Sequence, residues 1–95
     1  GVFSVNDGGA MGALAAIQGS GKDIKLTSVD GAPEAVKAIA DGGPFIETTA
    51  QFPRDQVRVG LAMALAQKWG ARVVPKEVPI DVMVVDSKNA GDFSW

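Results

Sequence analysis

Three residues with hydrogen-bonding side chains stand at the ends of apolar runs of the kind that form strands. They are Asn6, Asp30 and Gln51. Together they offer amide donors, amide acceptors and one carboxylate, which suits sugar hydroxyls because each hydroxyl both donates and accepts. A carboxylate that accepts from two neighbouring hydroxyls forms charge-assisted bonds, the stronger kind. Phe52, directly after Gln51, could offer an apolar ring contact to the C–H side of a sugar.

Each of these positions also has an ordinary structural interpretation. Asp30 precedes a glycine and could be a turn residue, and Gln51 could be a solvated loop residue. Phe52 could pack as a staple against the helix that Pro53 begins, and Asp7 is expected to be the N-cap of the first helix. The recurrence of polar residues at three successive strand ends favours one shared cleft, because independent turn residues need not converge.

The composition excludes several classes of chemistry. The 95 residues include no Cys, no His and no Tyr, which leaves no thiolate, no imidazole ligand and no Ser-His-Asp triad. Nine Lys and Arg residues against 11 Asp and Glu residues give a formal net charge of -2. No basic surface for nucleic acid is therefore expected. We expect a binding module that is not an enzyme and that holds no metal and no cofactor.

Two glycine-rich segments resemble nucleotide-binding motifs without completing them. Residues 19–22 match part of a phosphate-binding loop, but that loop needs glycine at position 16 and Ser or Thr at position 23. The chain has Ala16 and Asp23 there. The glycines of residues 8–12 lie between a strand and a helix, but Ala10 replaces the second glycine of the dinucleotide fingerprint. A small Rossmann-like enzyme domain is therefore the least favoured alternative.

The elements that must position the three residues alternate between strand and helix. Apolar periodicity, glycine and proline predict strands at 2–5, 24–29, 45–50 and 78–85, and helices at 7–19, 33–42 and 53–69. Strands joined through helices need a parallel sheet with right-handed crossovers. We expect an open, parallel, doubly wound α/β sheet of about four strands, with ligand beyond the carboxyl ends of the strands. Pro79 predicts that the last strand starts late or lies at an edge, and 86–95 should wrap a surface.

Four segments resemble the type I periplasmic sugar-binding proteins, the ribose-binding-like substrate-binding proteins of ABC transporters. The segments are 3–13 (the family's ND…GA pattern), 29–35 (its DG-P pattern), 37–42 (the helix that follows) and 49–53 (its AQ-P pattern). Four motifs in register are more specific than any one of them, and the similarity runs into the last strand near Val85.

The resemblance implies a fold and a function. Asn6, Asp30 and Gln51 match the positions at which the family hydrogen-bonds a sugar or sugar alcohol. The implied fold is a partial lobe of a two-lobed periplasmic receptor. That receptor closes around a carbohydrate and delivers it to the membrane permease of an ATP-driven importer.

A family chain is much longer, so we expect residues 1–95 to be a C-terminal fragment. The resemblance implies that 1–51 belong to the ligand-binding lobe, that the helix in 52–70 belongs with the other lobe, and that 71–95 form the return strand and tail. Because exposed apolar faces tend to associate, the fragment is expected to form a homodimer, with strands that can exchange between chains. The sugar-sensing domain of a LacI-like transcription regulator shares the lobe architecture and stays open as an alternative.

Overall fold

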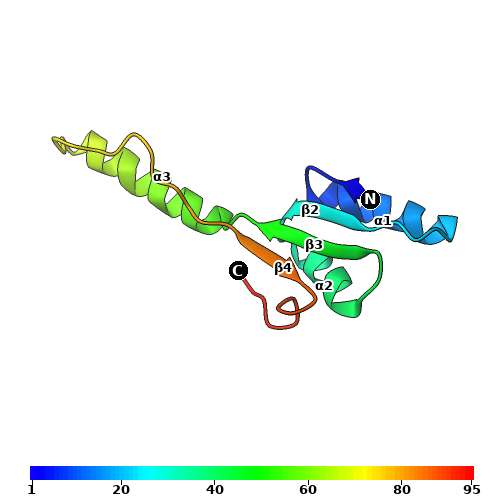
Figure 1. Ribbon diagram of the computed structural model, residues 1–95. Helices are drawn as coiled ribbons and strands as arrows, with labels where there is room; N and C mark the ends of the chain where they lie inside the picture. The colour runs from blue at the N-terminus through cyan, green and yellow to red at the C-terminus, as the bar shows by residue number, and fades with distance from the viewer.

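The computed structural model describes residues 1–95, which form an open sheet with three helices (Figure 1). In chain order the elements are β1 (Val2–Phe3), α1 (Asp7–Ser20), β2 (Leu26–Asp30), α2 (Pro33–Asp41), β3 (Phe45–Ala50), α3 (Pro53–Lys68) and β4 (Met83–Asp86). The α/β class and the sheet of four strands are confirmed.

The strands lie in the order β1-β2-β3-β4, and the first three are parallel. β4 is antiparallel to β3, so the prediction of an entirely parallel sheet is wrong for the last strand. The path of the chain explains the difference, because α3 leaves from the carboxyl end of β3 and the next segment returns to that same end (Figure 1). Met83, which opens β4, consequently pairs with Ala50, which closes β3. The strand starts late and lies at an edge, as Pro79 predicted.

The core lies on one face of the sheet. Its buried strand residues are Leu26, Ser28, Phe45, Thr48, Ala50 and Val85. α1 and α2 pack against this face and contact each other, whereas Val84 on the opposite face is 53% exposed. A doubly wound sheet carries helices on both faces, so this detail of the prediction is also corrected. Right-handed crossovers that move across a sheet in one direction place their helices on the same side.

Proline and glycine mark the helix ends as the sequence predicted. Pro33 and Pro53 are the first residues of α2 and α3, where the missing N–H of proline costs no hydrogen bond. Gly21 follows α1 in the left-handed conformation, with φ of 67°, which glycine adopts without steric cost. None of the three helices is long and apolar enough to span a membrane.

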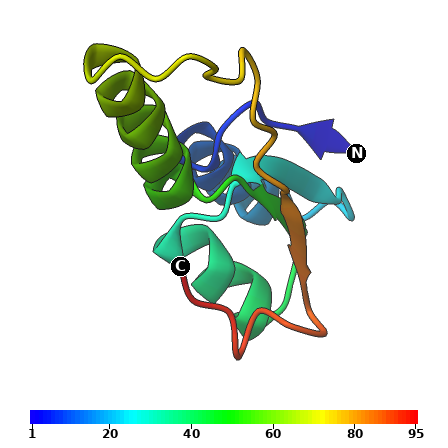
Figure 2. The same ribbon diagram turned by 90° about the vertical axis from the view of Figure 1, so that its left-hand side faces the viewer.

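α3 stands away from the sheet and gives the molecule its length. Figures 1 and 2 show α3 and the segment that returns from it leaving the sheet at one end, and the overall dimensions are 59 × 23 × 16 Å. α3 contributes no buried residue, whereas α1 and α2 both supply the core. Val57 and Leu61, at 68% and 59% exposure, face solvent, whereas Val59, Met63, Leu65 and Ala66 are half-buried.

The residues after β4 fold back over the core. Ala90 is buried among the core side chains, and Phe93 packs against them. The rings of Phe52, Phe93 and Trp95 form a triangle with centroids 6.0–6.2 Å apart. The tail therefore wraps a surface, as predicted, and its aromatic residues meet the start of α3.

Candidate functional site

The three residues predicted to bind a ligand lie together at the carboxyl edge of the parallel strands. Asp30 is the last residue of β2 and pairs with Ala50, the last residue of β3. The Gln51 N–H donates to the Asp30 carbonyl at 3.2 Å. On the other side, the Asp7 N–H donates to Asp30 Oδ2, also at 3.2 Å. Asp30 therefore sits between Gln51 and the Asn6–Asp7 pair, as the parallel arrangement of β1, β2 and β3 predicts.

Asn6 is the N-cap of α1, and the expectation that Asp7 has this role is wrong. Asn6 is extended, with φ of -153°, and its Oδ1 accepts the Gly9 N–H at 2.6 Å. Capping uses the side-chain oxygen, because the first N–H groups of a helix lack intrahelical acceptors. The side chain is exposed, and no hydrogen bond within the chain involves its Nδ2. Asn6 consequently presents an amide donor at the edge of the sheet.

Asp30 has a backbone conformation that is rare for any residue other than glycine. Its φ is +134°, which costs free energy and persists only where the surrounding structure holds it. The side chain is half-buried, and Oδ2 is its only oxygen with a partner inside the chain. Oδ1 is therefore free to accept hydrogen bonds from a ligand, while Oδ2 fixes the direction of the carboxylate.

Gly31 allows the strained turn after Asp30 to lie tightly against β3. Its φ is +82°, and a Cβ at this position would lie 2.7 Å from the Cβ of Ala50. No larger residue fits without moving the backbone. The Gly31 N–H donates to Thr48 Oγ at 3.2 Å, so the turn is bonded to the middle of β3 and not only to its end.

Gln51 and Phe52 connect the edge of the sheet to α3. Gln51 is half-buried, its side chain has no partner within the chain, and its carbonyl accepts from Gln56 Nε2 at 2.6 Å. Phe52 is the residue before α3 and has φ of +51°. Its ring packs with Phe93 and Trp95. The staple role considered for Phe52 is thus replaced by packing against the tail, and a ring contact with a ligand stays a prediction.

A buried polar network behind the site was missed at the sequence level. The Asp7 side chain is 0% exposed and accepts hydrogen bonds from the hydroxyls of Ser28 and Thr48, and from the Ala32 N–H. The sequence signal was present, because Ser28 and Thr48 lie on the buried face of strands whose other inward residues are apolar. Buried hydroxyls require partners, and Asp7 provides one. No cluster of acidic side chains that could hold a metal ion occurs in the chain.

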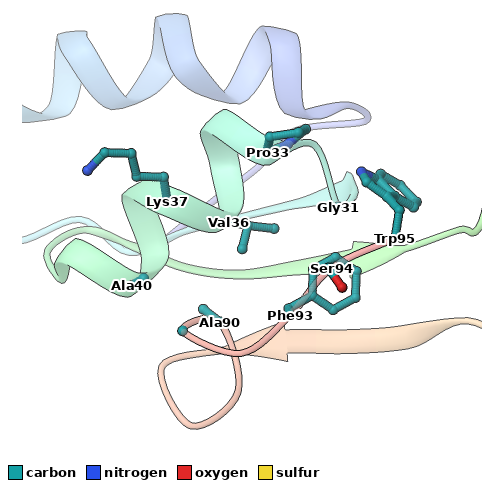
Figure 3. Close-up of a pocket in the computed structure, with 10 residues that line it drawn as sticks. Gly31, Pro33, Val36, Lys37, Ala40, Ala90, Phe93, Ser94 and Trp95 are labelled. Carbon is teal, nitrogen blue, oxygen red and sulfur yellow. The ribbon is translucent and has the colours of Figure 1, made fainter.

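A separate cavity of about 400 Å³ lies between α2 and the tail (Figure 3). Its walls include Val36, Phe93 and Trp95. Lys37 extends away from the two aromatic rings (Figure 3) and pairs with Asp41 at 2.5 Å. The cavity therefore lacks the convergent donors and acceptors of the edge formed by Asn6, Asp30 and Gln51.

A model of the family described as "periplasmic binding protein domain" matches residues 1–71. The ribose import binding protein RbsB of Salmonella typhimurium is 38% identical over 85 residues, which cover 88% of this chain and 28% of that protein. The D-galactose/methyl-galactoside binding periplasmic protein MglB of Haemophilus influenzae is 34% identical over 97% of this chain and 30% of its own. The chain thus spans less than a third of the length of these relatives.

Solved structures of solute-binding proteins match nearly the whole chain. An ABC transporter solute-binding protein from Mycobacterium smegmatis, with bound glycerol, has a TM-score of 0.86 and 34% identity, and covers 95% of this chain and 31% of its own. The myo-inositol binding protein of Caulobacter, bound to myo-inositol, has a TM-score of 0.82 and 30% identity, and covers 97% of this chain and 31% of its own. Such coverage includes α3, so its position relative to the sheet recurs in larger proteins.

Proposed function

Because this chain belongs to the periplasmic binding protein family, we propose that it supplies part of one wall of the cleft of a sugar or sugar-alcohol receptor for an ATP-driven importer. The family inferred from four sequence motifs is confirmed. The family is periplasmic, in agreement with the predicted location. The relatives are binding proteins, which supports a function in binding without catalysis.

The observation that carries the proposal is the pairing of an open donor with an open acceptor at the strand edge. Asn6 uses its oxygen for the cap and keeps Nδ2 for a ligand, while Asp30 keeps Oδ1. One ligand hydroxyl can accept from the first and donate to the second. The half-buried Gln51 adds an amide that can do both. The Asp30 carboxylate disfavours anionic ligands by like charge, so the proposed ligand is a neutral carbohydrate or polyol.

The ligands named for the relatives agree with this chemistry. They are ribose, galactose, glycerol and myo-inositol, all of them neutral molecules that carry several hydroxyl groups. In the proposed receptor, 1–51 belong to the ligand-binding lobe, 52–70 pack with the other lobe, and 71–95 return to the first. The absence of any buried residue in α3 supports this division. The 95-residue chain by itself is expected to form a homodimer through such faces, and a monomer in sedimentation velocity would contradict that expectation.

The test is a binding panel on the complete receptor, measured by isothermal titration calorimetry. Neutral pentoses, hexoses and polyols are compared with sugar acids and nucleotides. Asp30→Ala should lower the affinity for the best neutral ligand roughly a hundredfold, about 3 kcal/mol, because it removes charge-assisted bonds. Asp41→Ala is the matched control, since this exposed carboxylate pairs with Lys37 away from the site.

Two results would overturn the proposal. The first is an Asp30→Ala receptor that binds within about threefold of the unsubstituted protein, since threefold corresponds to well under 1 kcal/mol. The second is a receptor that prefers nucleotides or sugar acids over every neutral ligand of the panel.

A further inference from the structure

We propose that Asp7 is a positioning residue, whose buried carboxylate holds the strained Asp30–Ala32 turn so that Asp30 is aimed at the ligand before the ligand arrives. The inference rests on the proposed function, because it assigns Asp7 to the same site. It concerns a residue with no exposed surface. Asp7 therefore does not contact a ligand in this arrangement and acts through Asp30.

Asp7 forms hydrogen bonds directly with the turn. Its Oδ2 accepts the Ala32 N–H at 2.6 Å, and its own N–H donates to Asp30 Oδ2 at 3.2 Å. One residue thus bonds the side chain of Asp30 and the backbone two residues later. The two hydrogen bonds thus hold both ends of the segment in which Asp30 and Gly31 have positive φ, 134° and 82°.

Thr48 connects the Asp7 carboxylate to the turn. Its hydroxyl donates to Asp7 Oδ1 at 2.7 Å and accepts the Gly31 N–H at 3.2 Å. A hydroxyl that donates its hydrogen bond to a carboxylate can still accept one through its lone pairs. The charge on Asp7 therefore orients the Thr48 hydroxyl so that its oxygen accepts from Gly31. The N–H groups of Gly31 and Ala32 are consequently both held by the Asp7 carboxylate, one of them through Thr48.

No cationic side chain pairs with Asp7. The ion pairs of the chain join Lys25 to Asp23, Lys37 to Asp41 and Arg58 to Asp55, and none includes Asp7. The carboxylate is stabilised by three hydrogen-bond donors and by its place in the first turn of α1. Burying a carboxylate without a cation costs free energy. What the Asp7 carboxylate provides in return is the set of hydrogen bonds that fixes the turn after Asp30.

The test is a double-mutant cycle in the complete receptor. Asp7→Asn replaces one acceptor oxygen by a donor and should lower the affinity for the best neutral sugar about tenfold. In an Asp30→Ala background the same change should have almost no effect, because the carboxylate that Asp7 positions is gone. An equal loss of affinity in both backgrounds, or no loss in either, would overturn the positioning role.

Thr48→Val and Ser28→Ala form a matched pair that separates positioning from stability. Both remove a buried hydroxyl that donates to Asp7 Oδ1, but only Thr48 also bonds the turn. We expect similar losses in the free energy of unfolding and a clearly larger loss of affinity for Thr48→Val. Equal losses of affinity would contradict the relay. The pair also carries the test if Asp7→Asn does not fold.

Amide hydrogen exchange tests the positioning role of Asp7 without any ligand, and therefore independently of the proposed function. In ligand-free Asp7→Asn or Thr48→Val receptor, exchange at Gly31 and Ala32 should accelerate about tenfold or more, while exchange at the core strand residue Val85 changes much less. If the unsubstituted receptor binds no neutral sugar, the proposed function fails and this readout still decides whether Asp7 holds the turn. Unchanged exchange at Gly31 and Ala32 would overturn the inference whatever the ligand.

Discussion

The edge of the sheet and α3 are built in opposite ways from the same short chain. At the edge, strained residues are held by buried groups, as Asp30 is held by Asp7 and Gly31 by Thr48. α3 is a regular helix of 16 residues, none of which is fully buried. A strained backbone conformation persists only where many surrounding contacts hold it. An amphipathic helix, by contrast, needs only a surface against which its apolar face can pack.

The contrast between these two regions shows which part of the chain is self-contained. The strands, α1, α2 and Ala90 of the tail form one core of 11 buried apolar residues, and the turn after β2 rests on that core. α3 keeps its position relative to the sheet in solved proteins of about three times this length, with a TM-score of 0.86 over 95% of the chain. The site region therefore carries its own support, and α3 is expected to gain its support from the rest of a receptor.

The largest effect should come from the core under the site. Phe45 is 1% exposed in β3, and Phe45→Ala should cost about 3–5 kcal/mol of unfolding free energy by loss of burial and formation of a cavity. Urea unfolding followed by circular dichroism measures it. A loss below about 1 kcal/mol would show that the core does not support the site as described, because surface substitutions give effects of that size.

A matched pair of glycines tests how tightly the turn is held. Gly31 and Gly21 both have positive φ, 82° and 67°, but a Cβ would strike Ala50 at Gly31 and would meet open space at Gly21. Gly21 is in the left-handed helical conformation, so Gly21→Ala should cost about 1 kcal/mol from the backbone conformation alone. Gly31→Ala should cost about 2 kcal/mol or more, because the contact with Ala50 is added. It should also weaken ligand binding, since Asp30 must move.

Thermal unfolding and calorimetry of the two glycine variants measure these differences. Equal destabilisation by Gly31→Ala and Gly21→Ala would mean that the close approach to Ala50 is unimportant. Loss of affinity in Gly21→Ala alone would contradict the assignment of the site to the edge of the sheet.

The sequence predicted the parts of the fold that local rules control. Alternating apolar residues placed β3 at 45–50, and proline placed the start of α3 at Pro53, as observed. The convergence of Asn6, Asp30 and Gln51 followed from parallel strands, because their carboxyl ends share one edge.

The remaining features depend on contacts that local patterns do not contain. The direction of β4 is set by where the chain returns after α3. The apolar run in 78–85 would have the same pattern in a parallel or an antiparallel strand, so the sequence pattern does not predict the direction. Asp7 looked like an ordinary helix cap because its partners, Ser28 and Thr48, lie 21 and 41 residues further along the chain. The strain at Asp30 is likewise produced by distant residues and is invisible in a strand-turn pattern.

A smaller effect is expected at the exposed donor of the site. Asn6→Ala removes both the cap and the free amide, and should cost about 1 kcal/mol of stability. Asn6→Asp keeps the capping oxygen and places a second carboxylate near Asp30. It should preserve stability and lower the affinity for a neutral sugar about tenfold, because a donor is replaced by an acceptor.

Calorimetry and thermal unfolding of the complete receptor separate these two roles of Asn6. If Asn6→Asp binds as well as the unsubstituted receptor, the residue is only a cap. If both variants lose stability equally, the cap assigned to Oδ1 is wrong.

The smallest effect should be found on α3. In the 95-residue chain, Leu61→Ala should change the free energy of unfolding by less than about 0.5 kcal/mol, because an exposed side chain loses no packing. In the complete receptor the same substitution should cost about 2 kcal/mol or more if 52–70 pack with the other lobe. Urea unfolding of both forms makes the comparison, with Phe45→Ala as the reference that is costly in each. A negligible cost in both would place this face of α3 in solvent throughout and would remove the proposed division of the chain, while leaving the site at the edge of the sheet unaffected.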